Sequence, residues 1–244
     1  MRPHGRKPNE LRPLAFRRKY TKQAPGSVLV TSGQTWVLCT CSVENTVPPF
    51  LAGKEKGWLS AEYGMLPGST SSRKPRDKAG KVDGRSVEIQ RLIGRSLRAV
   101  VDLSKLGERT LWLDCDVLQA DGGTRTAAIN GAFVALVDAL HSLRADLPPI
   151  ESIVRDSLAA ISVGLVEGSE VLDLEYVEDK DADVDFNDFN VVMTGSGEYV
   201  EVQGAGEGST FSRPQLDRLL KLAKDGIDDI TAKQKKSLGS AWPW

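Results

Sequence analysis

The sequence predicts an α+β protein built from two similar units, because strands come before helices in each half of the chain. In the first half, β-rich runs at 27–31, 35–43 and 58–66 precede a strongly periodic helix at 85–101. In the second half, four short strands precede helical segments that begin after Ser212. Each unit is therefore expected to be a mixed sheet with helices packed on one face.

A linker at the Pro148-Pro149 pair divides the two units. The composition changes there from basic to acidic: residues 1–25 hold eight Lys and Arg against one Glu, whereas residues 167–188 hold ten Asp and Glu against one Lys. We therefore predict an N-terminal half at 1–147 and a C-terminal half at 148–244. Separate basic and acidic blocks, which nearly cancel in the net charge of −1, suit a protein that binds a polyanion and a divalent cation.

The composition argues against several classes of protein. No apolar run approaches the roughly 20 residues of a membrane span, and the N-terminus lacks the apolar segment of a secretory signal. Three cysteines and two histidines are too few and too scattered for a zinc site. Cysteines in apolar settings, as here, are typical of reduced core thiols, so we expect a cytoplasmic protein with no membrane partner.

The first predicted strands form a hairpin, because the runs 27–31 and 35–43 flank the short loop Ser32-Gly33-Gln34. A third strand is expected at 58–66. The apolar side chains of the hairpin are expected in the core: Val28, Val30, Trp36, Leu38, Cys39 and Cys41.

A strand, a glycine turn and a helix occupy the centre of the chain. Residues 111–118 alternate as in a strand, residues 121–123 (Asp-Gly-Gly) break the pattern, and apolar residues then recur at helical spacing as far as Leu143. The turn places Thr124 and Arg125 in the first turn of the helix, where backbone N–H groups have no intrahelical partner. A cation at such a helix start favours an anion. The alternative is that Asp121 or Thr124 only caps the helix while Arg125 is solvated.

A second arginine stands at a helix start. Arg85 follows Asp83-Gly84 and opens the helix predicted at 85–101. If the two helices pack side by side, both starts can converge on one phosphate. Further along this helix, Arg91, Arg95 and Arg98 share one face.

Two basic segments are candidates for gripping RNA. Residues 67–84 form a long loop without an apolar anchor, and Arg73 and Arg76 lie in it. Residues 1–13, with three prolines, are expected to form an extended arm that either contacts RNA phosphates or only keeps the chain soluble. The basic residues of the arm region are Arg2, Arg6, Lys7, Arg12 and Arg17.

The second half is expected to contain four short strands, a glycine-rich loop and two helices. The strands are predicted at 157–166, 171–177, 189–194 and 199–203, and the loop at 204–209. Ser212 caps the first predicted helix, and the second spans 227–238.

The acidic stretch 173–188 offers a metal site. Asp179 and Asp185 are the preferred pair, because Mg²⁺ needs only one or two protein carboxylates beside phosphate oxygens. Asp181, Asp183 and Asp188 compete with them. The alternative is that this stretch is a solvated acidic connector.

Motifs spread in order along the whole chain now point to one family. They include NELRP (9–13), GSVLVTSGQTWVLCTCSVE (26–44), AEYGMLP (61–67), GRSVEIQRLIGRSLRAVVDL (84–103), LDCDVLQADGGTRTAAINGA (113–132), DLEYVED (173–179) and NVVMTGSGEYVEVQG (190–204). In these motifs the chain resembles the ribonuclease PH family of phosphate-dependent tRNA nucleotidyltransferases.

The resemblance implies two related βαβ-type halves in one compact subunit of a homohexameric ring, a trimer of dimers. It also implies a phosphorolytic 3′-to-5′ exoribonuclease that trims the 3′ end of precursor tRNA, and by extension of rRNA. Inorganic phosphate is the co-substrate, a nucleoside diphosphate is released, and the reverse reaction adds nucleotides.

The family's site residues map onto positions already discussed. Phosphate binding maps onto Arg85, Gly123, Thr124 and Arg125, and the metal-linked aspartates map onto Asp179 and Asp185. The catalytic set is accordingly Arg85, Arg125, Asp179 and Asp185. Arg73, Arg76 and Arg91 are the candidate RNA contacts.

Two positions depart from the family pattern. Gly68 stands where the family usually has a basic residue, so the grip on RNA is expected to differ there. The step Asp-Phe-Asn is doubled at 185–187 and 188–190, which makes Asp188 a rival of Asp185 as second metal ligand; the six-residue spacing from Asp179 favours Asp185.

Two other functions fit part of the sequence. One is a non-catalytic RNA-binding ring subunit of an exosome-like assembly, against which the retained Arg85, Arg125, Asp179 and Asp185 argue. The other is a hydrolytic nuclease, which needs more closely clustered carboxylates for two metal ions than the chain offers outside the acidic stretch.

Overall fold

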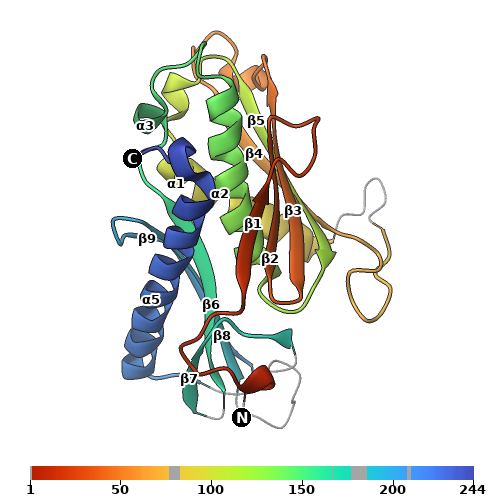
Figure 1. Cartoon of the computed structure of the whole chain (residues 1–244), viewed down its shortest axis with the longest axis vertical. Helices are drawn as coiled ribbons and strands as arrows, with labels where there is room; N and C mark the ends of the chain where they lie inside the picture. Colours follow the sequence, from red (N-terminus) through yellow and green to blue (C-terminus); the bar gives the residue numbers. More distant parts are fainter. Residues whose placement is uncertain (1, 77–82, 167, 177–185, 208–209) are drawn as a thin grey trace.

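The computed structural model describes residues 2–76, 83–166, 168–176, 186–207 and 210–244, and the chain folds into two sheets and three long helices within these ranges (Figure 1). The long helices are α1 (Gly84–Val100), α2 (Thr124–Ser142) and α5 (Arg213–Leu238). The shorter helices are α3 (Ile150–Ile153) and the 3₁₀ turns η1 (Pro3–Gly5), η2 (Pro49–Leu51), η3 (Leu103–Lys105) and η4 (Gly239–Ala241). None of the helices described is long and apolar enough to cross a membrane.

The first sheet is mixed and has the strand order β1-β2-β3-β5-β4. Its strands are β1 (Leu14–Arg18), β2 (Gly26–Ser32), β3 (Thr35–Glu44), β4 (Trp58–Met65) and β5 (Thr110–Gln119). All neighbours are antiparallel except β4 and β5, which are parallel and are joined through α1. A parallel pair needs such a crossover, so this half contains the expected βαβ unit. The predicted hairpin, third strand and central strand are confirmed, whereas β1 was not predicted.

The second sheet is antiparallel, with the order β7-β6-β8-β9. Its strands are β6 (Leu158–Val166), β7 (Ser169–Leu172), β8 (Phe186–Thr194) and β9 (Tyr199–Glu207). The expectation of a mixed sheet is therefore wrong for the strands described here, because all three strand pairs of this sheet are antiparallel. The predicted loop at 204–209 is also wrong at its start, since Gly204–Glu207 continue β9 in register with β8.

The helix α2 is the central element, because it packs on both sheets. It contacts β2 and β3 of the first sheet and β6 of the second. Almost every residue from Thr124 to Leu140 is buried, including side chains on all sides of the helix. A helix that is apolar all round belongs in the interior, and the main core accordingly includes residues of both sheets. The division between 1–147 and 148–244 stays a prediction.

The C-terminal helix is one element rather than the two that were predicted. α5 runs unbroken along β6 and β7 (Figure 1). Gly226, between the two predicted helices, is buried, and a Cβ added there would lie 2.6 Å from a methyl carbon of Leu172. This glycine therefore allows close packing against β7. The predicted start is confirmed, because the backbone N–H of Ser212 donates to Gln215 at 2.8 Å in a capping box.

The pleat of β3 corrects one prediction about the core. Val37, Cys39 and Cys41 are buried, whereas Trp36 is 41% exposed and Leu38 is only partly buried. Successive side chains of a strand point to opposite faces, so both groups cannot share the core. The alternation predicted for the central strand is confirmed, since Leu111, Leu113, Cys115 and Val117 are all buried.

Candidate anion-binding active site

A cavity of about 470 Å³ lies between the two units and is lined by residues from both sheets. The four predicted phosphate-binding residues, Arg85, Gly123, Thr124 and Arg125, all line it. The starts of α1 and α2 therefore meet at one cavity, and the two helices are in contact with each other. The second unit contributes residues of β6, of β8 and of the segment after β7: Ser162, Leu174, Glu175, Tyr176, Asp188 and Asn190.

The start of α2 carries no side-chain cap. Gly123 is the N-cap residue, with φ +64° in the left-handed region, and no side chain accepts from the first-turn N–H groups. The alternative that Asp121 or Thr124 caps this helix is therefore wrong. Gly122 also has a positive φ, +74°, and a Cβ there would lie 2.6 Å from the carbonyl oxygen of Leu174. Two glycines thus allow the turn to approach the second unit while backbone donors remain for an anion.

A buried tyrosine reaches the same helix start. The Tyr63 hydroxyl donates to Thr124 Oγ1 at 2.9 Å, and both residues are buried. Burial raises the pKa of Tyr63 above its usual value, despite the opposing effects of the Thr124 hydrogen bond and of the charges on Arg85 and Arg125. The phenol therefore stays protonated near neutral pH. Because Thr124 Oγ1 accepts the hydrogen bond from Tyr63, the hydroxyl hydrogen of Thr124 itself can be directed to a ligand.

The guanidinium of Arg125 is held at the cavity by side chains distant in the sequence. Its Nη1 donates to Gln203 Oε1 at 3.2 Å and lies 3.5 Å from Glu88 Oε1. Gln203 in turn donates from Nε2 to Glu88 at 3.1 Å. Sequence reasoning missed Glu88 and Gln203 as partners, because nothing local marks them: one lies on α1 and the other on β9.

At the start of α1, Asp83 accepts a hydrogen bond from the backbone N–H of Arg85 at 3.3 Å. The same carboxylate pairs with Lys74 at 2.8 Å, and this lysine lowers the pKa of Asp83. Lys74 lines the cavity, so it adds a third cation to those of Arg85 and Arg125.

The predicted metal ligands Asp179 and Asp185 lie outside the described residues. Their rival Asp188 is described: it lines the cavity and accepts from Asn190 Nδ2 at 3.3 Å. Across the residues that the structure describes, no group of three or more His, Cys, Asp or Glu residues could hold a metal ion. An oxygen donor such as Asp188 beside an anion site fits Mg²⁺, which takes one or two carboxylates and completes its shell with phosphate oxygens and water.

The candidate RNA contacts lie outside the cavity lining. Arg73, Arg76 and Arg91 are exposed, the first two on the loop after β4 and the third on α1. The other two arginines of the predicted face of α1 bind within the protein. Arg95 pairs with Glu201 at 2.6 Å, and Arg98 donates to the Leu59 carbonyl and lies over the Trp58 ring.

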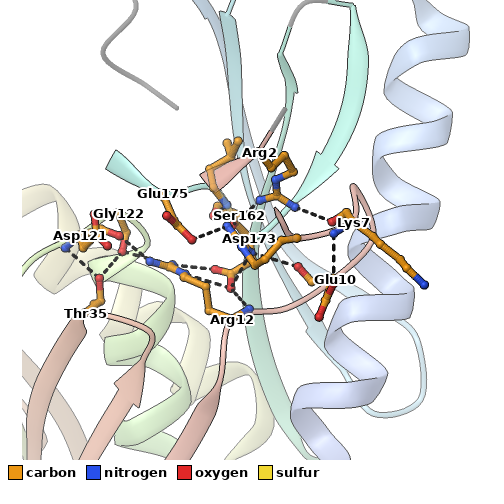
Figure 2. A network of polar contacts seen from close by, with 12 residues as sticks. Arg2, Lys7, Glu10, Arg12, Thr35, Asp121, Gly122, Ser162, Asp173 and Glu175 are labelled. Carbon is orange, nitrogen blue, oxygen red and sulfur yellow. Dashed lines mark hydrogen bonds and ion pairs between the residues drawn. The ribbon is translucent and has the colours of Figure 1, made fainter. Parts of the chain in front are cut away.

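Three arginines of the basic arm bind to the protein itself, so both expectations for the arm, RNA contact or solubility alone, are wrong for these three residues. Arg12 is only 3% exposed and forms a buried ion pair with Asp173 (Figure 2). Arg6 pairs with Glu175 at 2.8 Å, and both side chains are almost fully buried. Arg2 donates to the backbone carbonyl of Asp173 at 3.0 Å. These three side chains join the N-terminus to the segment after β7.

Comparison with known proteins gives one family. The models of the 3′ exoribonuclease family match over residues 10–141 (domain 1) and 156–226 (domain 2). Ribonuclease PH of Syntrophomonas wolfei is 54% identical over 240 residues, which cover 98% of this chain and 99% of that protein.

Solved structures agree in fold. Rice (Oryza sativa) Rrp46 has a TM-score of 0.77 at 20% identity, covering 97% of this chain and 100% of its own. A chain of the Archaeoglobus fulgidus exosome with RNA bound to the active site has a TM-score of 0.79 at 22% identity. The match covers 95% of this chain and 92% of that chain.

The chain therefore belongs to the 3′ exoribonuclease family. Within that family, its likeness to ribonuclease PH over nearly the full length makes it a phosphorolytic 3′-to-5′ exoribonuclease.

Proposed function

We propose that the cavity binds inorganic phosphate and directs it at the 3′-terminal phosphodiester of precursor tRNA and of other RNA. The observation that carries this proposal is the meeting of two helix starts, each with an arginine, in one cavity with the uncapped N-terminus of α2. Helix N-termini and guanidinium groups both favour a multiply charged oxyanion.

The reaction needs positioning more than it needs a protein nucleophile. An oxygen of hydrogen phosphate attacks the phosphorus of the last phosphodiester, and the bond from that phosphorus to the 3′ oxygen of the preceding nucleotide breaks. The departing 3′ oxygen takes the proton of the hydrogen phosphate, so a shortened RNA and a nucleoside diphosphate result. Two anionic groups approach each other in this step, and Arg85, Arg125 and Lys74 oppose their repulsion.

Magnesium is proposed as the cofactor, held by Asp179 and Asp185, with Asp188 as the rival second ligand. When bound, it would neutralise charge on the phosphodiester under attack. The described neighbour Asp188 supports a metal on the side of the cavity that belongs to the second unit, opposite the cationic helix starts.

The RNA strand is proposed to run over the basic loop and α1, where Arg73, Arg76 and Arg91 are exposed. We further propose a homohexamer built as a trimer of dimers and a cytoplasmic location. The likeness in fold to chains of archaeal exosomes keeps a non-catalytic ring subunit as the second candidate function. The presence of Arg85 and Arg125 in one cavity favours the enzyme.

The test is product analysis on a tRNA with a 3′ extension, with and without phosphate. The parent chain should release nucleoside diphosphates only with phosphate present. Arg125→Ala should lower kcat/KM at least about 100-fold, the usual effect of removing a group that stabilises developing charge. The matched control is Arg155→Ala, which removes a 61%-exposed arginine paired with Asp102 away from the cavity and should leave activity unchanged.

Two results would contradict the proposal. Release of nucleoside monophosphates at an equal rate without phosphate would identify a hydrolytic nuclease. RNA binding without release by the parent chain would identify the non-catalytic subunit.

A further inference from the structure

A single buried arginine joins the turn that begins α2 to the second unit. Arg12 donates from Nε and Nη2 to the two carboxylate oxygens of Asp173 at 3.1 and 2.7 Å, and its backbone N–H donates to the same carboxylate at 2.8 Å. On its other side, Nη1 donates to the carbonyl oxygen of Asp121, while the carbonyl of Gly122 lies 3.5 Å from Nη2. Figure 2 shows this guanidinium between Asp173 and the turn.

The turn needs such support because its own residues provide little. Gly122 and Gly123 both have positive φ and no side chain. Apart from Arg12, the Thr35 hydroxyl holds the turn: it donates to the Gly122 carbonyl at 2.6 Å and accepts from the Asp121 N–H at 2.9 Å. A Cβ on Gly123 would lie 3.0 Å from Arg12 Nη2, so the guanidinium lies directly against the N-cap residue of α2.

Asp173 is itself held at a defined place in the second unit. Its φ is +57°, its backbone N–H donates to the Ser162 carbonyl at 2.8 Å, and its carbonyl accepts from Arg6 at 3.0 Å. The residues that follow it, Leu174 to Tyr176, line the cavity and lead into the acidic stretch. Arg12 therefore connects the two walls of the cavity without lining it.

We propose that Arg12 is a positioning residue, which sets the place of the phosphate-binding turn relative to the second unit by binding Asp173 and the Asp121 carbonyl together. This inference rests on the proposed function, because it assumes that phosphate binds at the start of α2. Preorganised donors bind an anion more tightly than donors that must be ordered on binding. Loss of the bridge should therefore weaken phosphate binding and leave RNA binding on the exposed loop unchanged.

The chain offers a matched control in a second arginine–aspartate pair. Arg18 binds the Asp138 carboxylate and donates to the carbonyls of Ser237 and Leu238 at 2.7 and 3.0 Å. This pair also ties β1 to α2 and to the C-terminal end of α5. It lies near the far end of α2, however, and the 19 residues of that helix span about 28 Å.

The experiment compares Arg12→Lys with Arg18→Lys. Lysine keeps the charge opposite each carboxylate, but one ammonium group cannot reproduce the fork of contacts. Three quantities are measured: the dissociation constant of inorganic phosphate by calorimetry without RNA, the KM for phosphate at saturating RNA, and the RNA dissociation constant. Arg12→Lys should raise the first two at least tenfold and change the third less than twofold. Arg18→Lys should change all three less than twofold.

Two results would overturn the inference: phosphate binding by Arg12→Lys within twofold of the parent, or an equal loss in Arg18→Lys. If Arg12→Lys does not fold, Asp173→Asn keeps the shape of the pair and should raise the phosphate dissociation constant at least threefold. Calorimetry also separates this inference from the proposed function. If the parent chain binds no phosphate, both the proposed phosphate site and the positioning role of Arg12 are refuted. If the parent and Arg12→Lys bind phosphate equally tightly, only the positioning role is refuted.

Discussion

The hydroxyl of Tyr63 donates a hydrogen bond to Thr124 Oγ1 at 2.9 Å, which joins the end of β4 to the first turn of α2 beneath the cavity. Burial raises the pKa of Tyr63, so the phenol keeps the hydrogen that it donates, and the Thr124 hydroxyl hydrogen remains for a bound anion. The ring of Tyr63 thus packs in the core, and its hydroxyl orients the Thr124 hydroxyl at the cavity.

Tyr63→Phe should weaken phosphate binding while keeping the fold. The ring remains, but Thr124 loses the donor that orients it, so the KM for phosphate should rise about threefold to tenfold. The free energy of unfolding should fall by about 1 kcal/mol, the usual worth of one hydrogen bond. Steady-state kinetics and denaturant unfolding measure both. Tyr199→Phe, at a half-exposed tyrosine of β9, is the control, and an equal rise in KM there would refute the argument.

Gly122→Ala should destabilise the turn before α2 and should lower the stability of the protein more than replacement of an unconstrained glycine. The positive φ alone costs about 1–2 kcal/mol, and the new Cβ would lie 2.6 Å from the Leu174 carbonyl oxygen. Both the melting temperature and phosphate affinity should fall. Gly68→Ala, where nothing lies within 4 Å of the added Cβ, should change neither. A Gly122→Ala protein with the melting temperature of the parent would show that the turn tolerates a side chain.

The double substitution Arg73→Ala with Arg76→Ala should weaken RNA binding and leave phosphate binding unchanged. Each lost contact to a single-stranded phosphate lowers the salt dependence of binding, so the slope of log K against log salt should flatten by about 1.4. Lys221→Ala with Lys224→Ala removes two cations that pair along α5 and serves as the control. An unchanged slope would place the RNA elsewhere. Gly68→Lys adds a cation to the same loop and should strengthen RNA binding.

Removal of Mg²⁺ by a chelator should abolish nucleotide release. Substitution of single aspartates can then decide whether Asp185 or Asp188 is the second metal ligand. Asp179→Asn and Asp185→Asn should raise the Mg²⁺ concentration for half-maximal activity at least tenfold. Asp188→Asn should raise it less than threefold. Titration of activity with Mg²⁺ measures all three. A larger effect at Asp188 would make it the second ligand, in agreement with its place in the cavity lining.

If the proposed homohexamer forms, its mass should be about six times the chain mass of 26.5 kDa. Large apolar side chains exposed on the single chain, among them Tyr20, Phe50 and Trp244, are expected to be covered by neighbouring subunits. Light scattering coupled to size exclusion measures the mass directly. A monomeric or dimeric mass at micromolar concentration would contradict the ring.

Local features of the sequence predicted the parts of the site that depend on one element at a time. The glycine turn before Thr124 and the position of Arg85 at a helix start can each be recognised from a few neighbouring residues. In the structure, the turn and Arg85 both line the cavity. The binding roles of these residues stay predictions. The partners Glu88 and Gln203 were invisible, because they reach Arg125 from elements far along the chain.

What the sequence determined by itself was the kind and order of most elements and the two helix starts, since hydrophobic periodicity and capping act over a few residues. Tertiary structure alone decided that α5 is continuous, that Trp36 faces outward, and that Arg12 is buried against Asp173 rather than free for RNA. The reason is physical. A pattern states which side chains lie on one face, but which faces meet, and which charges they bury together, depends on the packing of the whole chain.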